Sequence, residues 1–156
     1  MSLIVIGHSC SGKTTWSKKF CQENDYKYVD LGVYKDEFCE RYGWKQLLPA
    51  DCSKLLDLYL DRVCVQALLD HQGENCVFDG IDFLSLPMSL LKPYSIVVVN
   101  PAHDVIIERY RNRCKNHPVA EIRNLSDEQI NDLAKAMIKE NDYYVNALIP
   151  SADIVV

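Results

Sequence analysis

The sequence predicts an α/β domain with a parallel sheet, because short apolar runs alternate along it with stretches of helical period. Five runs suit strands of such a sheet, and they are Leu3–Ile6, Tyr26–Asp30, Asn75–Asp79, Ser95–Asn100 and Ala152–Val156. A chain of 156 residues can bury a core of ordinary size. We therefore expect residues 1–156 to form a single domain.

The first apolar run leads into Gly7-His8-Ser9-Cys10-Ser11-Gly12-Lys13-Thr14, which has the pattern G-x-x-x-x-G-K-T. The pattern is typical of a phosphate-binding loop between a strand and a helix. Glycines let the backbone curl close to an anion, and the helix N-terminus adds N–H donors. The Lys13 ammonium suits the β and γ phosphates, and the Thr14 hydroxyl suits Mg²⁺. The predicted nucleotide-binding residues are Gly7, His8, Ser9, Cys10, Ser11, Gly12, Lys13, Thr14 and Thr15.

Two other predicted strands end in a carboxylate. Asp30 closes the second run and Asp79 closes the third, with Asp82 shortly after it. Ligands of open parallel sheets gather beyond the carboxyl ends of the strands. Asp79 can hold Mg²⁺ through water or orient an acceptor, and Asp82 is a candidate for the same role.

Four cations crowd the end of the helix predicted to begin at Asn100-Pro101, namely Arg109, Arg111, Arg113 and Lys115. They could simply complement the helix dipole. Arg109 and Arg113, however, share a face four residues apart, and arginine stabilises charge on a transferring phosphoryl group. We favour a functional role for at least one of these two.

Aromatic and basic residues interleave between Val33 and Trp44, including Lys35 and Arg41. This stretch suits either a surface helix with half-buried rings or an acceptor pocket that stacks a planar ring. Periodicity also predicts one long core helix over Ala50–Gln72. A second, opened by a capping box at Ser126, should point Ile130, Leu133, Ala134, Met137, Ile138, Tyr144, Val145 and Leu148 inward. The residues before it, about 114–125, lack periodicity and suit a short lid.

Composition argues against a membrane-spanning, secreted or disulfide-rich protein. The net charge is −5, the longest apolar runs are too short to span a membrane, and no signal peptide is evident. The seven cysteines are scattered without C-x-x-C, as in a reduced cytoplasmic chain. Most suit small core positions, and Cys10 in the loop could be redox-sensitive. No paired His or Cys spacing indicates a metal site at His71, His103 or His117.

In these motifs the chain resembles the small phosphate-loop kinases, which include nucleoside monophosphate, shikimate and gluconate kinases and the kinase domain of polynucleotide kinase. The resemblance is carried by Gly7 to Thr15, Asp30, Asp79-Gly80, Arg109, Arg113, Tyr144 and Ala152-Asp153. It implies a three-layer P-loop NTPase sandwich with sheet order 2-3-1-4-5, ATP as phosphate donor and Mg²⁺ as cofactor. It also implies a lid arginine at the phosphates and an arginine such as Arg109 near the adenine.

The individual families fit less well. Trp16 is similar to the start of polynucleotide kinase, but the acids and arginine of that family after the second strand are not evident. Asp79-Gly80 is similar to adenylate kinase without the following Pro-Arg, and the substrate arginines of shikimate kinase are absent. The acceptor therefore stays open.

We expect an ATP-dependent kinase with catalytic residues Lys13, Asp30, Arg109 and Arg113. The expected acceptor-binding residues are Lys35, Arg41 and Asp82, and the metal-binding ones are Thr14 and Asp79. The rings favour a planar, nucleoside-like acceptor, free or in nucleic acid, as for viral kinases of hydroxymethyluracil in DNA. Alternatives are a nucleoside monophosphate or small-metabolite kinase, a nucleotide-gated ATPase or switch, and a nucleotide-binding module without catalysis. The chain could act as a monomer or homodimer.

Overall fold

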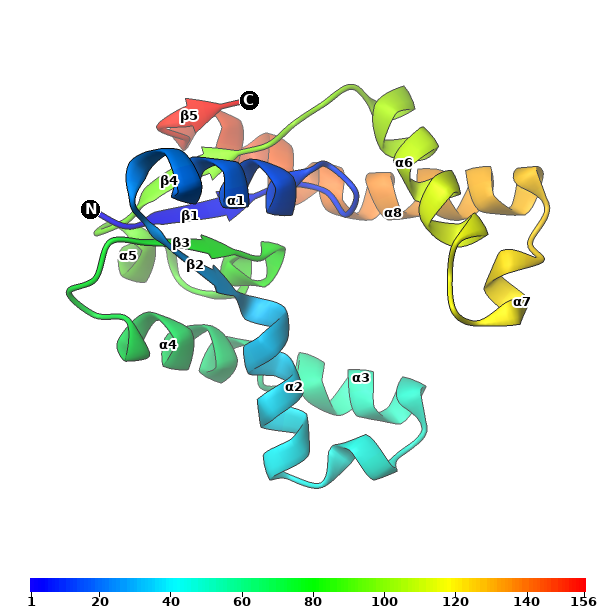
Figure 1. Ribbon diagram of the computed structural model, residues 1–156, viewed down its shortest axis with the longest axis horizontal. Coiled ribbons are helices and arrows are strands. Elements are labelled where there is room, and N and C mark those ends of the chain that lie inside the picture. The colour runs from blue at the N-terminus through cyan, green and yellow to red at the C-terminus, as the bar shows by residue number, and fades with distance from the viewer. The chain divides into compact units, whose positions relative to one another are not determined.

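The structure, a computed structural model, describes all residues from 1 to 156, and its strands belong to one five-stranded sheet (Figure 1). The strands are β1 (Leu3–Ile6), β2 (Lys27–Asp30), β3 (Cys76–Asp79), β4 (Ser95–Val98) and β5 (Ile154–Val155). Their order is β2-β3-β1-β4-β5, and the pairs β1–β3, β2–β3 and β4–β5 are parallel. The fold class and the sheet order predicted from the sequence are confirmed.

The chain divides into two compact units, which are described in turn. The first, the strand unit, comprises residues 1–5 and 17–95, and the second, the loop unit, comprises residues 6–16 and 96–156.

The strand unit holds most of the sheet and the helices that follow its first two strands. Its elements besides strands are most of α1 (Lys13–Asn24), α2 (Leu31–Arg41), η1 (Trp44–Gln46), α3 (Pro49–Asp57), α4 (Leu60–Asp70), η2 (Ile81–Ser85) and α5 (Met88–Leu91). Strand β3 is buried along its whole length. Its register pairs Asp79 with Asp30 of β2, so the two acids lie side by side at the carboxyl ends of neighbouring strands.

The single long helix predicted over residues 50–72 is wrong. The chain forms α3 and α4 instead, which are separated at Leu58 and Tyr59. Only α4 buries its apolar stripe, through Val63, Cys64, Ala67 and Leu68, whereas α3 buries no residue fully. A continuous apolar period fits two helices as well as one, so it does not reveal the joint at Leu58, which is 73% exposed.

The loop unit joins the glycine loop to β4, β5 and the C-terminal helices. It contains α6 (His103–Lys115), α7 (Ala120–Arg123), α8 (Asp127–Leu148) and η3 (Ile149–Ser151). In Figure 1 the long helix α8 runs beside α6, and the two helices pack together. The capping box of α8 is confirmed, because Ser126 accepts from the Gln129 backbone and Gln129 accepts from the Ser126 backbone.

Two details of the loop unit differ from the sequence prediction. Helix α6 begins after Ala102 rather than at Asn100-Pro101, and no side chain caps it. Asn100 instead donates its backbone N–H to Val156, which continues the pairing of β4 with β5. On α8, Leu133 and Tyr144 were expected to face the core but are 46% and 52% exposed, because they lie beside the buried stripe of Ile130, Ala134 and Ile138.

The segment predicted as a short lid carries the one-turn helix α7, which follows α6 and precedes α8 along the chain (Figure 1). Arg123 donates to the backbone oxygens of His117 and Pro118, at 2.7 and 2.6 Å, and so holds the turn before α7. A lid function for residues 114–125 stays a prediction. No helix in the chain is both long and apolar enough to cross a membrane.

Candidate active site

The glycine loop between β1 and α1 is shaped by close backbone approaches. A Cβ on Gly7 would lie 2.3 Å from the Val99 carbonyl oxygen, so no other residue fits at that position. Gly12 has a φ of +98°, in the region that favours glycine, and a Cβ there would lie 2.8 Å from Nη1 of Arg109. The Ser11 N–H donates to the His8 oxygen at 3.1 Å, which closes the turn.

The loop has groups that suit a phosphate. Helix α1 begins at Lys13 with no acidic residue in its first turn, so nothing in its own sequence offsets the positive end of the dipole. The Ser11 hydroxyl is buried without a hydrogen-bond partner. Curled backbone, a helix N-terminus and a lysine are the parts from which anion sites are built, so the residues present fit nucleotide phosphates.

Lys13 bends back over the first turn of the loop. Its Nζ donates to the backbone oxygens of Gly7 and His8, at 2.9 and 2.7 Å. The charge of the ammonium therefore lies at the loop, as the motif predicts. Thr14 follows at the start of α1 and is exposed.

Two arginines of α6 reach the same loop. Arg109 Nη1 donates to the Ser11 oxygen at 2.5 Å and to the Cys10 oxygen at 3.5 Å. Arg113 Nη1 lies 3.5 Å from the Ser9 hydroxyl, while both side chains remain largely exposed. Arg111, on another face, pairs with Glu108 and Asn131 instead. The shared face predicted for Arg109 and Arg113 thus brings both cations to the phosphate loop.

The two predicted acids of the strand unit have different surroundings. Asp30 is exposed and caps α2, because its Oδ1 accepts the Gly32 N–H at 2.8 Å. Asp79 is only 7% exposed, and its Oδ2 accepts the Tyr28 hydroxyl at 3.1 Å. The second oxygen of Asp30, Oδ2, takes no part in this cap. The hydrogen bond from Tyr28 fixes the orientation of the buried Asp79.

Asp30 also lines an open pocket of about 380 Å³ within the strand unit, which we call the edge pocket. Its walls are Lys18, Lys27, Tyr28, Val29, Asp30, Val33, Tyr34 and His71. Lys18 lies over the Tyr28 ring, with Nζ 5.2 Å from the centroid. Burial is the main cause that raises the pKa of Tyr34 to about 12, so its hydroxyl keeps its proton at neutral pH. A position of Lys18 and Lys27 at this pocket was not predicted from the sequence, because neither lysine belongs to a motif.

The predicted acceptor residues Lys35 and Asp82 form an ion pair with each other. Arg41 lies apart from them, beside a small cavity of about 60 Å³ with Tyr34, Phe38 and Asp70. The rings of Phe38, Tyr42, Trp44 and Tyr59 pack against one another, with centroids 4.8 to 5.9 Å apart. These four rings therefore pack with one another, whereas the rings of Tyr28 and Tyr34 line the edge pocket.

Sequence comparison finds no match among protein-family models and none among curated proteins. Solved structures do share the fold. A shikimate kinase from Bacteroides thetaiotaomicron is 18% identical with a TM-score of 0.66, covering 99% of this chain and 85% of its own. A shikimate kinase from Acinetobacter baumannii in complex with shikimate is 15% identical with a TM-score of 0.63, covering 99% and 82%.

An uncharacterized protein from Eubacterium ventriosum is 13% identical with a TM-score of 0.54, covering 100% and 87%. At these identities the likeness concerns the fold. The chain therefore has the fold of small phosphate-loop kinases over its full length.

Proposed function

We propose that this protein is an ATP-dependent kinase that phosphorylates a hydroxyl group of a small acceptor. The observation that carries the proposal is the meeting of Lys13, Arg109 and Arg113 at a G-x-x-x-x-G-K-T loop. Three cations around one anion site exceed what nucleotide binding needs, and they suit the charge that develops during phosphoryl transfer. The kinase fold of the neighbours supports the same reaction class.

Each group would have a separate role. ATP would supply the phosphoryl group, and Mg²⁺ would neutralise part of its charge. On the sequence motifs alone, Thr14 and Asp79 are the metal ligands that we propose, Asp79 through water. Lys13, Arg109 and Arg113 would stabilise negative charge at the loop. Asp30 would accept the proton of the acceptor hydroxyl, because Asp30 is exposed and the hydrogen bond from the Gly32 N–H to Oδ1 fixes its orientation.

The edge pocket supports a planar acceptor that carries negative charge. Its walls place two tyrosine rings, Tyr28 and Tyr34, with the ammonium group of Lys18, and Asp30 belongs to the same lining. Lys27 lines the pocket too, but its ammonium is paired with Glu74. A ring can stack on the tyrosines while its anionic group pairs with a lysine. Nucleotides have both the planar ring and the anionic group, whereas shikimate-like hydroxy acids share only the anionic group. Lys35, Arg41 and Asp82 stay candidates for binding the acceptor.

Nucleic acid is a weaker candidate as acceptor. Four cations that could meet a phosphate backbone already face an acid, in the pairs Lys35–Asp82, Lys45–Glu40, Arg111–Glu108 and Lys115–Asp127. With a net charge of −5, such pairing leaves few cations for a duplex. DNA that carries modified bases nevertheless belongs in the test.

The test is an acceptor screen with γ-labelled ATP over hydroxy acids, nucleosides, nucleoside monophosphates, 5′-hydroxyl oligonucleotides and modified-base DNA. We expect one class to become labelled, and Lys13→Ala and Asp30→Asn to abolish the transfer. Asp36→Asn is the matched control, because Asp36 is an exposed acid of the same helix region. Release of free phosphate with no labelled acceptor would instead establish an ATPase or switch, and full activity of Asp30→Asn would move the base to Asp79 or Asp82.

A further inference from the structure

A second polar cluster lies in the loop unit, beside the phosphate-binding groups. It joins His8 of the glycine loop, His103 at the first position of α6 and Asp142 of α8. Asp142 Oδ1 lies 2.8 Å from His8 Nε2 and 3.3 Å from His103 Nε2. The two imidazole rings meet edge to face, with centroids 5.9 Å apart. Three elements distant in sequence thus present two nitrogens and one oxygen to the same point.

These separations fit a coordination sphere. Metal–ligand bonds of about 2.0–2.2 Å put neighbouring ligands of a Zn²⁺-like ion roughly 3–3.5 Å apart. One ligand atom from each residue lies within 4.8 Å of the others, so small side-chain shifts would centre an ion among them. His8 Nδ1 is buried without a hydrogen-bond partner, and binding of a metal ion through Nε2 would place the ring proton on this nitrogen.

Burial gives the cluster one closed and one open side. His8 is fully buried, whereas Asp142 is 30% and His103 54% exposed. An ion could enter from the side of His103 and keep water at its remaining positions. Three protein ligands with an open position are the arrangement found in zinc sites that are not purely structural.

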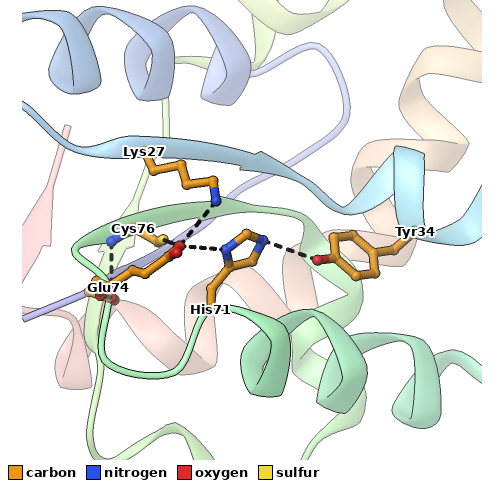
Figure 2. Close-up of polar contacts among 6 residues, drawn as sticks. Lys27, Tyr34, His71, Glu74 and Cys76 are labelled. Carbon is orange, nitrogen blue, oxygen red and sulfur yellow. Dashed lines mark hydrogen bonds and ion pairs between the residues drawn. The ribbon is translucent and has the colours of Figure 1, made fainter.

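The charges around the cluster also suit a cation. Asp142 pairs with the two imidazoles and with no lysine or arginine. A second group of possible ligands, His71, Glu74 and Cys76, provides the contrast (Figure 2). There Glu74 Oε2 already accepts from Lys27 at 3.2 Å and from His71 Nδ1 at 2.7 Å.

The remaining ligands of that second group are also engaged. The Tyr34 hydroxyl is hydrogen-bonded to Nε2 of His71, at 3.0 Å (Figure 2). Burial raises the pKa of the Cys76 thiol to about 11, so the sulfur stays protonated. The Lys27 ammonium at Glu74 Oε2 and the protonated Cys76 thiol both disfavour binding of a metal ion. This group is better explained as a polar network whose hydrogen bonds are satisfied.

We propose that His8, His103 and Asp142 bind a divalent transition-metal ion of the Zn²⁺ class. The site is separate from the Mg²⁺ ligands proposed at Thr14 and Asp79, and nitrogen donors suit zinc rather than magnesium. The bound ion ties the first turn of the phosphate loop to the beginning of α6 and to α8. The inference does not depend on the kinase activity.

The test measures metal binding by the full chain after chelation and under reducing conditions. Isothermal titration with ZnCl₂ should show one saturable site, and Zn²⁺ should raise the melting temperature. His103→Gln and Asp142→Asn should each weaken Zn²⁺ affinity at least about ten-fold and remove the thermal shift. His103 is exposed, so its variant tests the site even if Asp142→Asn is unstable. His117→Gln is the control, because that histidine lies in the same unit outside the cluster.

Co²⁺ separates this site from the seven free cysteines. Visible d–d absorption without a thiolate charge-transfer band is expected, and His103→Gln should remove it. Absence of saturable binding, equal Zn²⁺ affinity in wild type and His103→Gln, or a thiolate band that carries the binding would each overturn the proposal.

Discussion

Gly12 is the position at which one added methyl group should disable the phosphate loop. In Gly12→Ala the Cβ would lie 2.8 Å from Arg109 Nη1, on a backbone with φ +98°. The strained backbone should cost about 1–2 kcal/mol of stability. Displacement of Arg109 should also weaken ATP binding by at least about ten-fold, which equals about 1.4 kcal/mol. Chemical denaturation and nucleotide titration measure the two effects.

Gly43→Ala is the matched control for that change. Gly43 has a φ of +71°, and a Cβ there would have nothing within 4 Å. It should therefore show a similar loss of stability with unchanged ATP affinity. If both variants bind ATP like the wild type, the close packing of Arg109 on the loop has no part in nucleotide binding.

Cys76 should make stability depend on alkaline pH. Burial, followed by the hydrogen bond to Glu74, raises the pKa of its thiol from 9.0 to about 11. Above pH 9 the unfolded chain releases this proton while the folded chain keeps it. The free energy of unfolding should therefore fall between pH 9 and pH 11, by about 2 kcal/mol from this group.

Urea unfolding of wild type and Cys76→Ala at pH 8 and pH 10.5, with reductant, measures that contribution. The variant should lose less stability over this interval, because it lacks the thiol. An equal loss in both proteins would show that the Cys76 thiol does not titrate differently in the folded and unfolded chains.

Among single residues, those with local signals could be predicted from the sequence. The glycine loop and the capping box of Ser126 and Gln129 depend on residues three to seven positions apart, and both appear as expected. The partnership of His8 with Asp142 joins positions 134 residues apart, and the Lys35–Asp82 pair spans 47. Side-chain partners at such distances depend on packing, which no spacing in the sequence records.

At the scale of elements, α6 shows how one helix can present two unlike faces. Its Arg109 and Arg113 reach the glycine loop, whereas Arg111 pairs with Glu108 and Asn131. Under the proposed kinase function, Arg109→Ala or Arg113→Ala should lower kcat by about a hundred-fold or more, since a positioned arginine can contribute about a thousand-fold. Steady-state kinetics with the acceptor found in the screen provides the measurement.

Arg111→Ala keeps the helix and removes the same charge, so it serves as the control and should retain most of the turnover. Equal losses in all three variants would point to the summed charge of α6, and unchanged kcat in the first two would exclude both arginines from phosphoryl transfer.

The elements themselves were predictable where burial is complete and less so at joints. Strands β1, β3 and β4 are wholly buried, and their apolar runs predicted them closely. The break between α3 and α4 was missed because α3 is only half-buried, so its apolar period carried little information on how it packs. The start of α6 was missed because Asn100 pairs with Val156 in the sheet instead of capping a helix.

At the scale of the whole molecule, the sheet order could be predicted from the resemblance to phosphate-loop kinases. Which charged side chains pair with one another could not be predicted, because it depends on the fold. Four cations that could meet a phosphate backbone face acids in the fold, namely Lys35, Lys45, Arg111 and Lys115. Opposite charges in such pairs cancel at the range over which a phosphate backbone attracts a protein.

This pairing predicts that the protein binds unmodified duplex DNA weakly, with Kd above about 10⁻⁴ M at physiological salt. Fluorescence anisotropy with a labelled duplex measures it. A variant with Glu40→Gln, Asp82→Asn, Glu108→Gln and Asp127→Asn raises the net charge from −5 to −1 and frees the four cations. Its DNA affinity should rise and fall steeply with added salt. Tight binding by the wild type would show that the exposed cations outside these pairs, such as Arg41, suffice for a duplex, and would return nucleic acid to the first place among acceptors.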